Sequence, residues 1–184
     1  MPDISGALLL LALPRKMEST RCAPTRAPRE KVRMAPKTSW FFAYGSILNA
    51  AQFQMRAGQV LERTTGELKG YELRFNKEVR GGSASANIQP AAGKSVRGVL
   101  YLIPESAYRN IDRFEGAPVH YRRIEVQVTE ADGRAISAQT FIATKVKKGL
   151  RPAPHYLQSI LNGAAEHGLP ADYIAGIRAE AGAN

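Results

Sequence analysis

A single carboxylate, that of Glu115, falls on the apolar side of a predicted helix. The helix covers residues 104–114. Its apolar residues follow the i, i+4, i+7 spacing of a stripe that faces a core, and they are Ala107, Ile111 and Phe114. Glu115 comes four residues after Ile111, about 40° around the helix from it. Its side chain is therefore predicted to point toward the buried side.

This position favours the neutral form of the Glu115 carboxyl group. Burial penalises its charge, the negative end of the helix macrodipole is near, and Asp112 adds repulsion between like charges. A carboxyl group with a raised pKa can accept and donate a proton near neutral pH, as a general acid and base must. The alternative is a structural glutamate, turned toward solvent or paired with Arg109, Arg113, Arg122 or Arg123.

The stretch from Trp40 to Leu48 is an apolar run that is interrupted by Gly45-Ser46 before a helical pattern begins at Asn49. Such a run is typical of a buried strand that ends in a tight loop and opens a helix. The N–H groups of that loop have no partner within the helix and converge on a point that suits an anion. Gly45 would let a ligand approach closely, and Ser46 would add a hydroxyl donor. The alternative is an ordinary strand-to-helix turn.

Ser46 is not expected to act as a nucleophile. No Gly-x-Ser-x-Gly elbow surrounds it, and the three histidines, His120, His155 and His167, belong to other segments. The sequence therefore does not predict a serine–histidine triad.

The elements that must position these residues are mainly strands. Alternating or apolar runs predict further strands at residues 67–75, 81–88, 96–103, 121–130 and 135–144, the last two forming a hairpin. In the first of these, Leu68, Leu73 and Phe75 are predicted to point inward, with an irregularity at Gly70. The small residues of the second mark a place where another group approaches the backbone. Other helices are predicted at residues 49–56, capped by Asn49, and at 156–167 and 171–179.

Length and composition allow one domain with a full core. The chain has 184 residues, of which 44% are hydrophobic. Its single cysteine, Cys22, excludes an internal disulfide and a cysteine-based metal cluster, so a cytoplasmic localisation is expected. The formal net charge is +10, and half of this excess lies in residues 1–39, which hold eight basic and three acidic side chains.

Residues 1–39 are predicted to be a basic, disordered extension that the fold does not need. Prolines interrupt this segment repeatedly, and it offers almost no apolar residue for burial between Pro14 and Trp40. The apolar run at 7–13 is too short to span a bilayer and follows no basic segment, so neither a membrane anchor nor a secretory signal is expected. Met34 is a sensible alternative start, and the domain is predicted to cover residues 40–180.

Four stretches between Trp40 and about Arg178 resemble motifs of the γ-glutamylcyclotransferase family, and they occur in the same order as in that family. The family includes γ-glutamylamine cyclotransferases and the avirulence-induced proteins. The Tyr-Gly-Ser-Ile-Leu of residues 44–48 resembles the family's Tyr-Gly-Ser-Asn-Leu loop. Residues 82–88 with 96–101 resemble its central strand pair. Residues 111–116 with Tyr121 resemble the segment that holds its catalytic glutamate. Residues 152–156 with 162–170 resemble its C-terminal signature. Together they are specific for the branch with the His-Gly-Leu-Pro ending.

The resemblance implies an α+β fold, a small mixed β-barrel surrounded by helices, with one pocket at the end of the first strand. It implies a reaction without metal or organic cofactor. The α-amine of a γ-glutamyl group attacks its own γ-carbonyl carbon, 5-oxoproline forms, and an amine or amino acid leaves. This is an intramolecular aminolysis, of the acyltransferase or lyase type.

The resemblance also implies a role for individual residues. Glu115 would take a proton from the α-ammonium group and return it to the leaving nitrogen. The backbone donors of residues 44–47 would hold the substrate's α-carboxylate. The residues implied to bind substrate are Phe41, Phe42, Ala43, Tyr44, Gly45, Ser46, Ile47, Tyr121 and Tyr156.

The sequence departs from the family pattern at two places. Ile47 stands where the family usually has Asn, and an apolar side chain cannot donate a hydrogen bond. The spacing from Glu115 to Tyr121 is one residue shorter than in the animal enzymes.

Three other functions stay open. The first is an enzyme of the same fold that acts on another γ-glutamyl compound, such as a γ-glutamylamine, and the second is a non-catalytic small-molecule-binding protein. The third is a nucleic-acid-binding protein, which is disfavoured because the basic excess outside the extension is spread out and no nucleic-acid motif is present. The expected partner is thus a small γ-glutamyl substrate, with no nucleic acid and no membrane. The oligomeric state is open, with a homodimer as the candidate.

Overall fold

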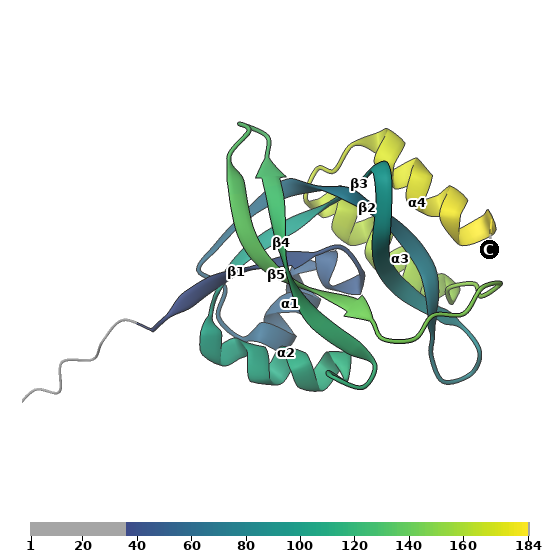
Figure 1. The fold of residues 1–184 in the computed structure, drawn as a ribbon, viewed down its shortest axis with the longest axis horizontal. Coiled ribbons are helices and arrows are strands. Elements are labelled where there is room, and N and C mark those ends of the chain that lie inside the picture. The colour runs from purple at the N-terminus through teal and green to yellow at the C-terminus, as the bar shows by residue number, and fades with distance from the viewer. Residues whose placement is uncertain (1–35, 184) are drawn as a thin grey trace, which may run out of the picture. The chain divides into compact units, whose positions relative to one another are not determined.

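Five strands close into a barrel in the order β1-β3-β2-β4-β5 (Figure 1). The computed structural model describes residues 36–183. Its strands are β1 (Thr38–Ala43), β2 (Glu62–Glu78), β3 (Ala84–Pro104), β4 (Tyr121–Glu130) and β5 (Ala135–Ala143). The pairs are antiparallel except for β1 with β5, which run parallel and close the barrel. The predicted α+β class, a small mixed barrel with surrounding helices, is confirmed.

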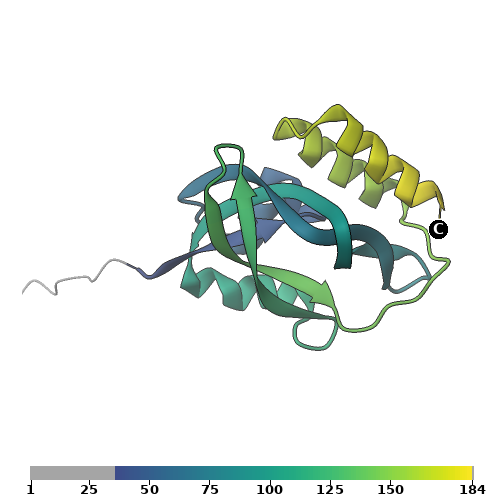
Figure 2. The ribbon, with the colours of Figure 1, turned by 45° about the horizontal axis from the view of Figure 1, so that its top comes forward.

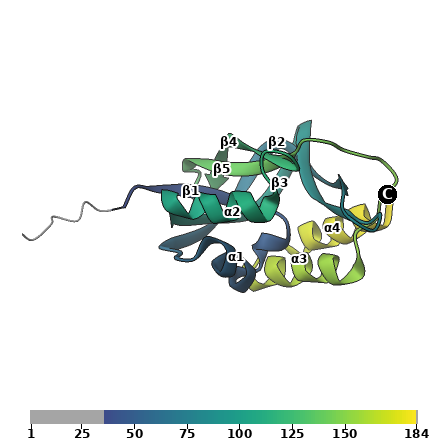
Figure 3. The same ribbon diagram turned by 90° about the horizontal axis from the view of Figure 1, so that it is seen from below.

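Within residues 36–183, four helices and two 3-10 turns accompany the barrel. They are η1 (Ser46–Leu48), α1 (Ala50–Ala57), η2 (Glu105–Ala107), α2 (Tyr108–Glu115), α3 (Pro154–Glu166) and α4 (Ala171–Ala183). Helices α3 and α4 lie side by side, away from α2 (Figure 2). Helix α2 lies beside β1 (Figure 3), where the hydroxyl groups of Ser39 and Tyr108 are hydrogen-bonded at 3.1 Å. Within residues 36–183, none of these helices is long and apolar enough to cross a membrane.

Strand β1 pairs with β3 on one side and with β5 on the other. Phe41, Phe42 and Ala43 are almost completely buried. A strand that is covered on both faces has no reason to alternate polar and apolar residues, which explains its continuous apolar run. The strand begins at Thr38, and most of the predicted extension, including Cys22 and Met34, lies outside the described residues.

The two strands predicted at 81–88 and 96–103 are one continuous strand, β3, so their separation was wrong. Between them Gln89, Pro90 and Ser95 pair with β2, across a register shift in which residues 91–94 have no partner in that strand. The residues of this connection are small or polar and give no apolar strand signal. The predicted irregularity at Gly70 is present as a register shift between Lys69 and Tyr71, where Gly70 has a φ of 79°. Leu68 and Phe75 are buried as predicted, and the core also contacts the half-buried Leu73.

The hairpin of β4 and β5 and the helix α1 match their predictions. The Asn49 side chain accepts a hydrogen bond from the N–H of Gln52 at 3.0 Å and so caps α1. Gly58 ends this helix with a φ of 79°.

The buried side of α2 differs from the prediction at one residue. Ala107 and Ile111 are buried as expected, but Phe114 is 63% exposed. The buried line runs in steps of four residues from 107 to 111 to 115, whereas Phe114 lies about 60° to the other side of Ile111. The i, i+7 expectation for Phe114 was therefore wrong, and Glu115 takes the buried position at the end of the helix.

Candidate active site

A cavity lies at the point where β1 ends and η1 begins. It has a volume of about 30 Å³. We call it the inner cavity, and its lining residues are Phe41, Tyr44, Gly45, Ser46, Ile47, Ala86, Glu115, Tyr121, Thr140, Phe141 and Tyr156. The structure thus brings together residues from β1, the loop of residues 44–47 that follows it, α2, β4 and α3. They include all of the predicted site residues except Phe42 and Ala43.

Phe42 and Ala43 are fully buried but do not line this cavity. The ring of Phe42 occupies the space beside Gly98, where a side chain on residue 98 would collide with it. Ala43 pairs with Val99 in the barrel. The structure therefore gives both residues a place in the core.

Glu115 is held at the cavity by its position as the last residue of α2. Gly116 follows it in the left-handed conformation, with a φ of 64°, and ends the helix there. The Glu115 side chain is only 17% exposed, and its Oε1 lies 2.9 Å from Nη1 of Arg56. Burial raises the pKa of the Glu115 carboxyl group, and the charge and hydrogen bond of Arg56 lower it, with a net raised pKa. This carboxyl group therefore holds its proton more tightly than an exposed glutamate does.

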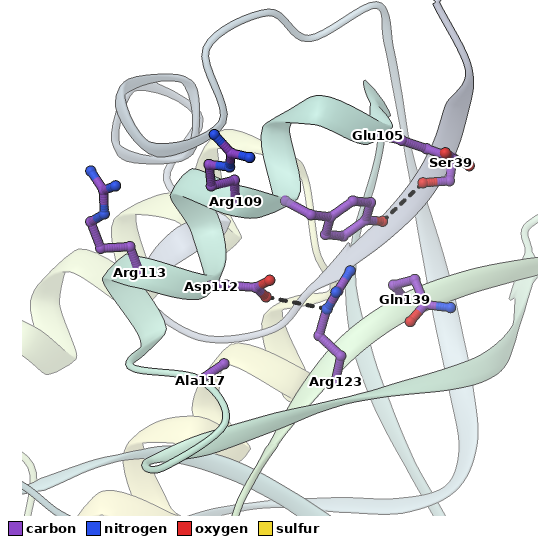
Figure 4. A pocket seen from close by; sticks show the side chains of 9 residues that line it. Ser39, Glu105, Arg109, Asp112, Arg113, Ala117, Arg123 and Gln139 are labelled. Carbon is purple, nitrogen blue, oxygen red and sulfur yellow. Dashed lines mark hydrogen bonds and ion pairs between the residues drawn. The ribbon is translucent and has the colours of Figure 1, made fainter.

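Asp112 does not act on Glu115 as the sequence predicted. Its carboxylate lies 3.2 Å from Nε of Arg123 on another side of α2, within a separate cleft (Figure 4). Burial is the cause that raises the pKa of Glu115.

The partner of Glu115 is a residue that the sequence analysis missed. Arg56 comes from the last turn of α1, whereas the arginines considered as partners were all close to Glu115 in sequence. The same guanidinium lies 5.7 Å from the centroid of the Phe114 ring, which gives that exposed aromatic a cation–π contact. A basic residue in the last turn of a helix is common, so the sequence carried no signal that singled Arg56 out.

Two tyrosine hydroxyl groups meet the backbone of Ala86 beside the cavity. The hydroxyl of Tyr121 donates to the carbonyl oxygen of Ala86 at 2.8 Å, and the N–H of Ala86 donates to the hydroxyl of Tyr156 at 2.9 Å. This explains the small residues at the start of β3, since a larger side chain would keep both rings away. Burial raises the pKa of both tyrosines, so they are neutral polar groups at neutral pH.

The loop at the end of β1 presents backbone donors to this cavity. In η1 the N–H of Leu48 bonds to the carbonyl oxygen of Gly45 at 2.9 Å. No hydrogen bond within residues 36–183 uses the N–H groups of Ser46 or Ile47. A Cβ on Gly45 would lie 3.4 Å from Cβ of Ala86, so the backbone approaches β3 closely here.

A second, wider cavity adjoins the first. It has a volume of about 380 Å³ and shares Ser46, Glu115, Tyr121 and Tyr156 with the inner cavity. We call it the outer cavity, and its other lining residues are Arg56, Lys77, Glu78, Val79, Arg80, Ser85, Phe114 and His120. The inner cavity has room for one or two water molecules, so any larger ligand at Glu115 must extend into the outer one.

The cleft in Figure 4 is larger, about 920 Å³, but it holds none of the predicted site residues. Of its two carboxylates, Asp112 is paired with Arg123, and Glu105 is exposed. In the part of the chain that the structure describes, no group of three or more His, Cys, Asp or Glu side chains could hold a metal ion. The candidate active site is therefore the inner cavity with its outer extension.

Comparisons with known proteins agree with this architecture. A model of the AIG2-like family matches residues 95–177. Human γ-glutamylcyclotransferase is 27% identical over 163 residues, which make up 85% of this chain and 83% of the human protein. The putative γ-glutamylcyclotransferase YkqA of Bacillus subtilis is 35% identical over 131 residues, 68% of this chain and 46% of that protein. A solved structure of a γ-glutamyl cyclotransferase has a TM-score of 0.73 and 26% identity, covering 78% of this chain and 88% of that one.

The closed mixed barrel is therefore the fold of the γ-glutamylcyclotransferases. The chain belongs to the γ-glutamylcyclotransferase family, as its motifs predicted, and is an enzyme of that type.

Proposed function

We propose that the protein converts the γ-glutamyl group of a small γ-glutamyl amino acid or amine to 5-oxoproline and releases the amine. The observation that carries the proposal is a largely buried glutamate with a raised pKa, Glu115, in one cavity with the unbonded N–H groups of Ser46 and Ile47. A proton-transfer group and an anion-binding loop are the two parts that such a cyclisation needs.

The reaction needs orientation more than a nucleophilic side chain, because the nucleophile is the substrate's own α-amine. The N–H groups of residues 44–47 bind the α-carboxylate and so fix the α-carbon beside Glu115. The Glu115 carboxylate takes a proton from the α-ammonium group, and the free amine attacks the γ-carbonyl carbon. A new C–N bond closes the five-membered ring, and Glu115 returns its proton to the leaving nitrogen as the γ-amide C–N bond breaks. The ring nitrogen then gives up its second extra proton, which the released amine takes as it becomes an ammonium ion.

The environment of Glu115 suits both halves of this proton transfer. A base must be ionised when the substrate arrives, and Arg56 at 2.9 Å favours the ionised form. An acid must hold its proton until the nitrogen leaves, and burial favours the protonated form. The two opposing effects support a group that works in both directions near neutral pH.

Release of 5-oxoproline tests the proposal directly. The purified protein is incubated with γ-glutamyl-alanine, a γ-glutamyl-lysine isopeptide and glutathione, and 5-oxoproline is quantified by mass spectrometry. We expect release from at least one of them, and none from α-glutamyl-alanine, whose γ-carboxyl group forms no amide. Absence of 5-oxoproline with all three substrates would contradict the proposal, and binding without release would favour the non-catalytic alternative.

Ile47 tests the carboxylate clamp. This side chain lines the inner cavity and is 8% exposed, and it cannot donate a hydrogen bond. We expect Ile47→Asn to lower KM by about three- to tenfold with kcat nearly unchanged, because the carboxylate is held equally in the ground and transition states. The control is Ile47→Val, which stays apolar. An unchanged or raised KM in Ile47→Asn would show that the side chain does not face the carboxylate.

The extent of the domain is also part of the proposal. We propose that the domain predicted at residues 40–180, extended to 38–183 by the bounds of β1 and α4, carries the activity and that the chain before Met34 is dispensable. A chain that starts at Met34 is expected to keep kcat/KM within about twofold and its melting temperature within a few degrees. Loss of folding or of turnover in that shorter chain would assign a structural role to the extension.

Two further points stay predictions. We propose a cytoplasmic location and leave a homodimer as the candidate assembly. Fractionation of the native source tests the location, and light scattering of the purified protein tests the assembly.

A further inference from the structure

Lys77 is a buried cation that the proposed reaction does not use. It lies in β2, its residue is 9% exposed, and it lines the outer cavity. Its ammonium group donates to the carbonyl oxygen of the adjacent Glu78 at 2.6 Å. No ion pair among residues 36–183 involves Lys77. A lysine that is this well covered and has no counter-ion is costly, so an anion that reached it from the outer cavity would be bound favourably.

The carboxylates around the outer cavity do not supply this anion, because each has another partner. Glu115 is paired with Arg56 at 2.9 Å, and Glu78 is paired with Lys147 at 2.7 Å. Arg80, on the same cavity, makes no ion pair within the described residues. The uncompensated charge of the outer cavity is therefore positive.

The position of Lys77 relative to the reaction follows from the two cavities. All four residues of the loop 44–47 line the inner cavity, and of them only Ser46 also lines the outer cavity. Lys77 lines the outer cavity and not the inner one. In the proposed reaction the α-carboxylate is held at that loop, and the γ-amide reacts at Glu115, where the cavities meet. The group that leaves must then extend into the outer cavity, which Lys77 lines.

We propose that Lys77 binds a carboxylate carried by the leaving group, so that the enzyme selects γ-glutamyl compounds whose leaving amine is an amino acid. This inference rests on the proposed function. The incoming carboxylate provides the missing counter-ion of Lys77, and a neutral amine in the same place leaves the ammonium group unpaired. Discrimination arises as much from that penalty as from the attraction.

A matched pair of substrates measures this discrimination. They are γ-glutamyl-alanine and γ-glutamyl-alaninamide, which have the same shape and differ in the charge of the leaving group. We expect kcat/KM of the unsubstituted protein to be about 10- to 100-fold higher for the acid, as is typical of hydrogen bonds to charged groups. A ratio near one contradicts the inference, whatever any variant does. Turnover of neither substrate contradicts the inference, and the proposed function is contradicted with it only if the isopeptide and glutathione release no 5-oxoproline either.

Substitutions then assign the discrimination to Lys77. We expect Lys77→Met, which keeps the length of the side chain and removes its charge, to reduce the acid-to-amide ratio to within about threefold of one. Lys77→Arg, which keeps a positive charge, retains most of the ratio. Lys145→Met is the control, since it removes an exposed lysine outside both cavities and leaves the ratio unchanged. A ratio that stays high in Lys77→Met contradicts the inference.

Discussion

Glu115→Gln lowers kcat for 5-oxoproline release by about 100- to 10,000-fold, the range that general acid–base catalysis supplies. The amide has the shape of the carboxyl group, and its oxygen can still accept the hydrogen bond that Arg56 donates at 2.9 Å. It cannot take a proton from the substrate's ammonium group. KM should stay within about threefold, because the substitution does not touch residues 44–47, which we propose to bind the α-carboxylate.

The measurement is steady-state kinetics with γ-glutamyl-alanine, accompanied by thermal unfolding. Glu105→Gln is the matched control, because it removes an exposed carboxylate from the turn that precedes the same helix. It should leave both kinetic constants unchanged. A Glu115→Gln variant with kcat within tenfold of the unsubstituted protein would make Glu115 a structural residue.

The same substitution changes how stability depends on pH. The pKa of Glu115 is raised above its ordinary value of 4.5 in the folded protein. Between these two pKa values the folded state binds more protons than the unfolded state, so the free energy of unfolding falls as pH rises through this window. Glu115→Gln removes this loss, and its unfolding free energy relative to the unsubstituted protein should therefore increase across the window.

The sequence could place Glu115 because the necessary information is local. A step of four residues from Ile111 keeps a side chain on the same face of a helix, whatever the rest of the fold does. The step of three to Phe114 moves about as far to the other side, so the stripe predicted both a buried glutamate and, wrongly, a buried phenylalanine. Helical geometry does not tell which of the two sides next to Ile111 is buried. In the fold, the side of Glu115 is covered and the side of Phe114 is not.

The parts of the site that depend on tertiary contacts could not be predicted. Arg56 reaches Glu115 because α1 packs against α2, and no local pattern encodes that contact. Ala86 was expected to have a close neighbour, but only the fold shows that the neighbours are the hydroxyl groups of Tyr121 and Tyr156. Lys77 has the appearance of an ordinary strand lysine in the sequence, and its burial depends on the segments that surround the outer cavity.

Arg56→Met shifts the acidic limb of the pH profile of kcat/KM to higher pH. The guanidinium of Arg56 lowers the pKa of Glu115 by its charge and by its hydrogen bond, in opposition to burial. Without this cation the carboxyl group stays protonated to higher pH, and a protonated group cannot accept the substrate's proton. We expect kcat/KM at neutral pH to fall by about 10- to 100-fold, with recovery as the pH rises.

Recovery at high pH separates this effect from simple loss of structure, which no increase in pH would repair. Arg56→Lys serves as the comparison, because it keeps a positive charge but loses the planar guanidinium. Its acidic limb should lie between those of the unsubstituted protein and of Arg56→Met. Phe114→Leu controls for the lost cation–π contact, since it removes the ring under Arg56 and leaves the ion pair in place. An acidic limb that stays in place or moves to lower pH in Arg56→Met would mean that Arg56 does not set the proton affinity of the Glu115 carboxyl group.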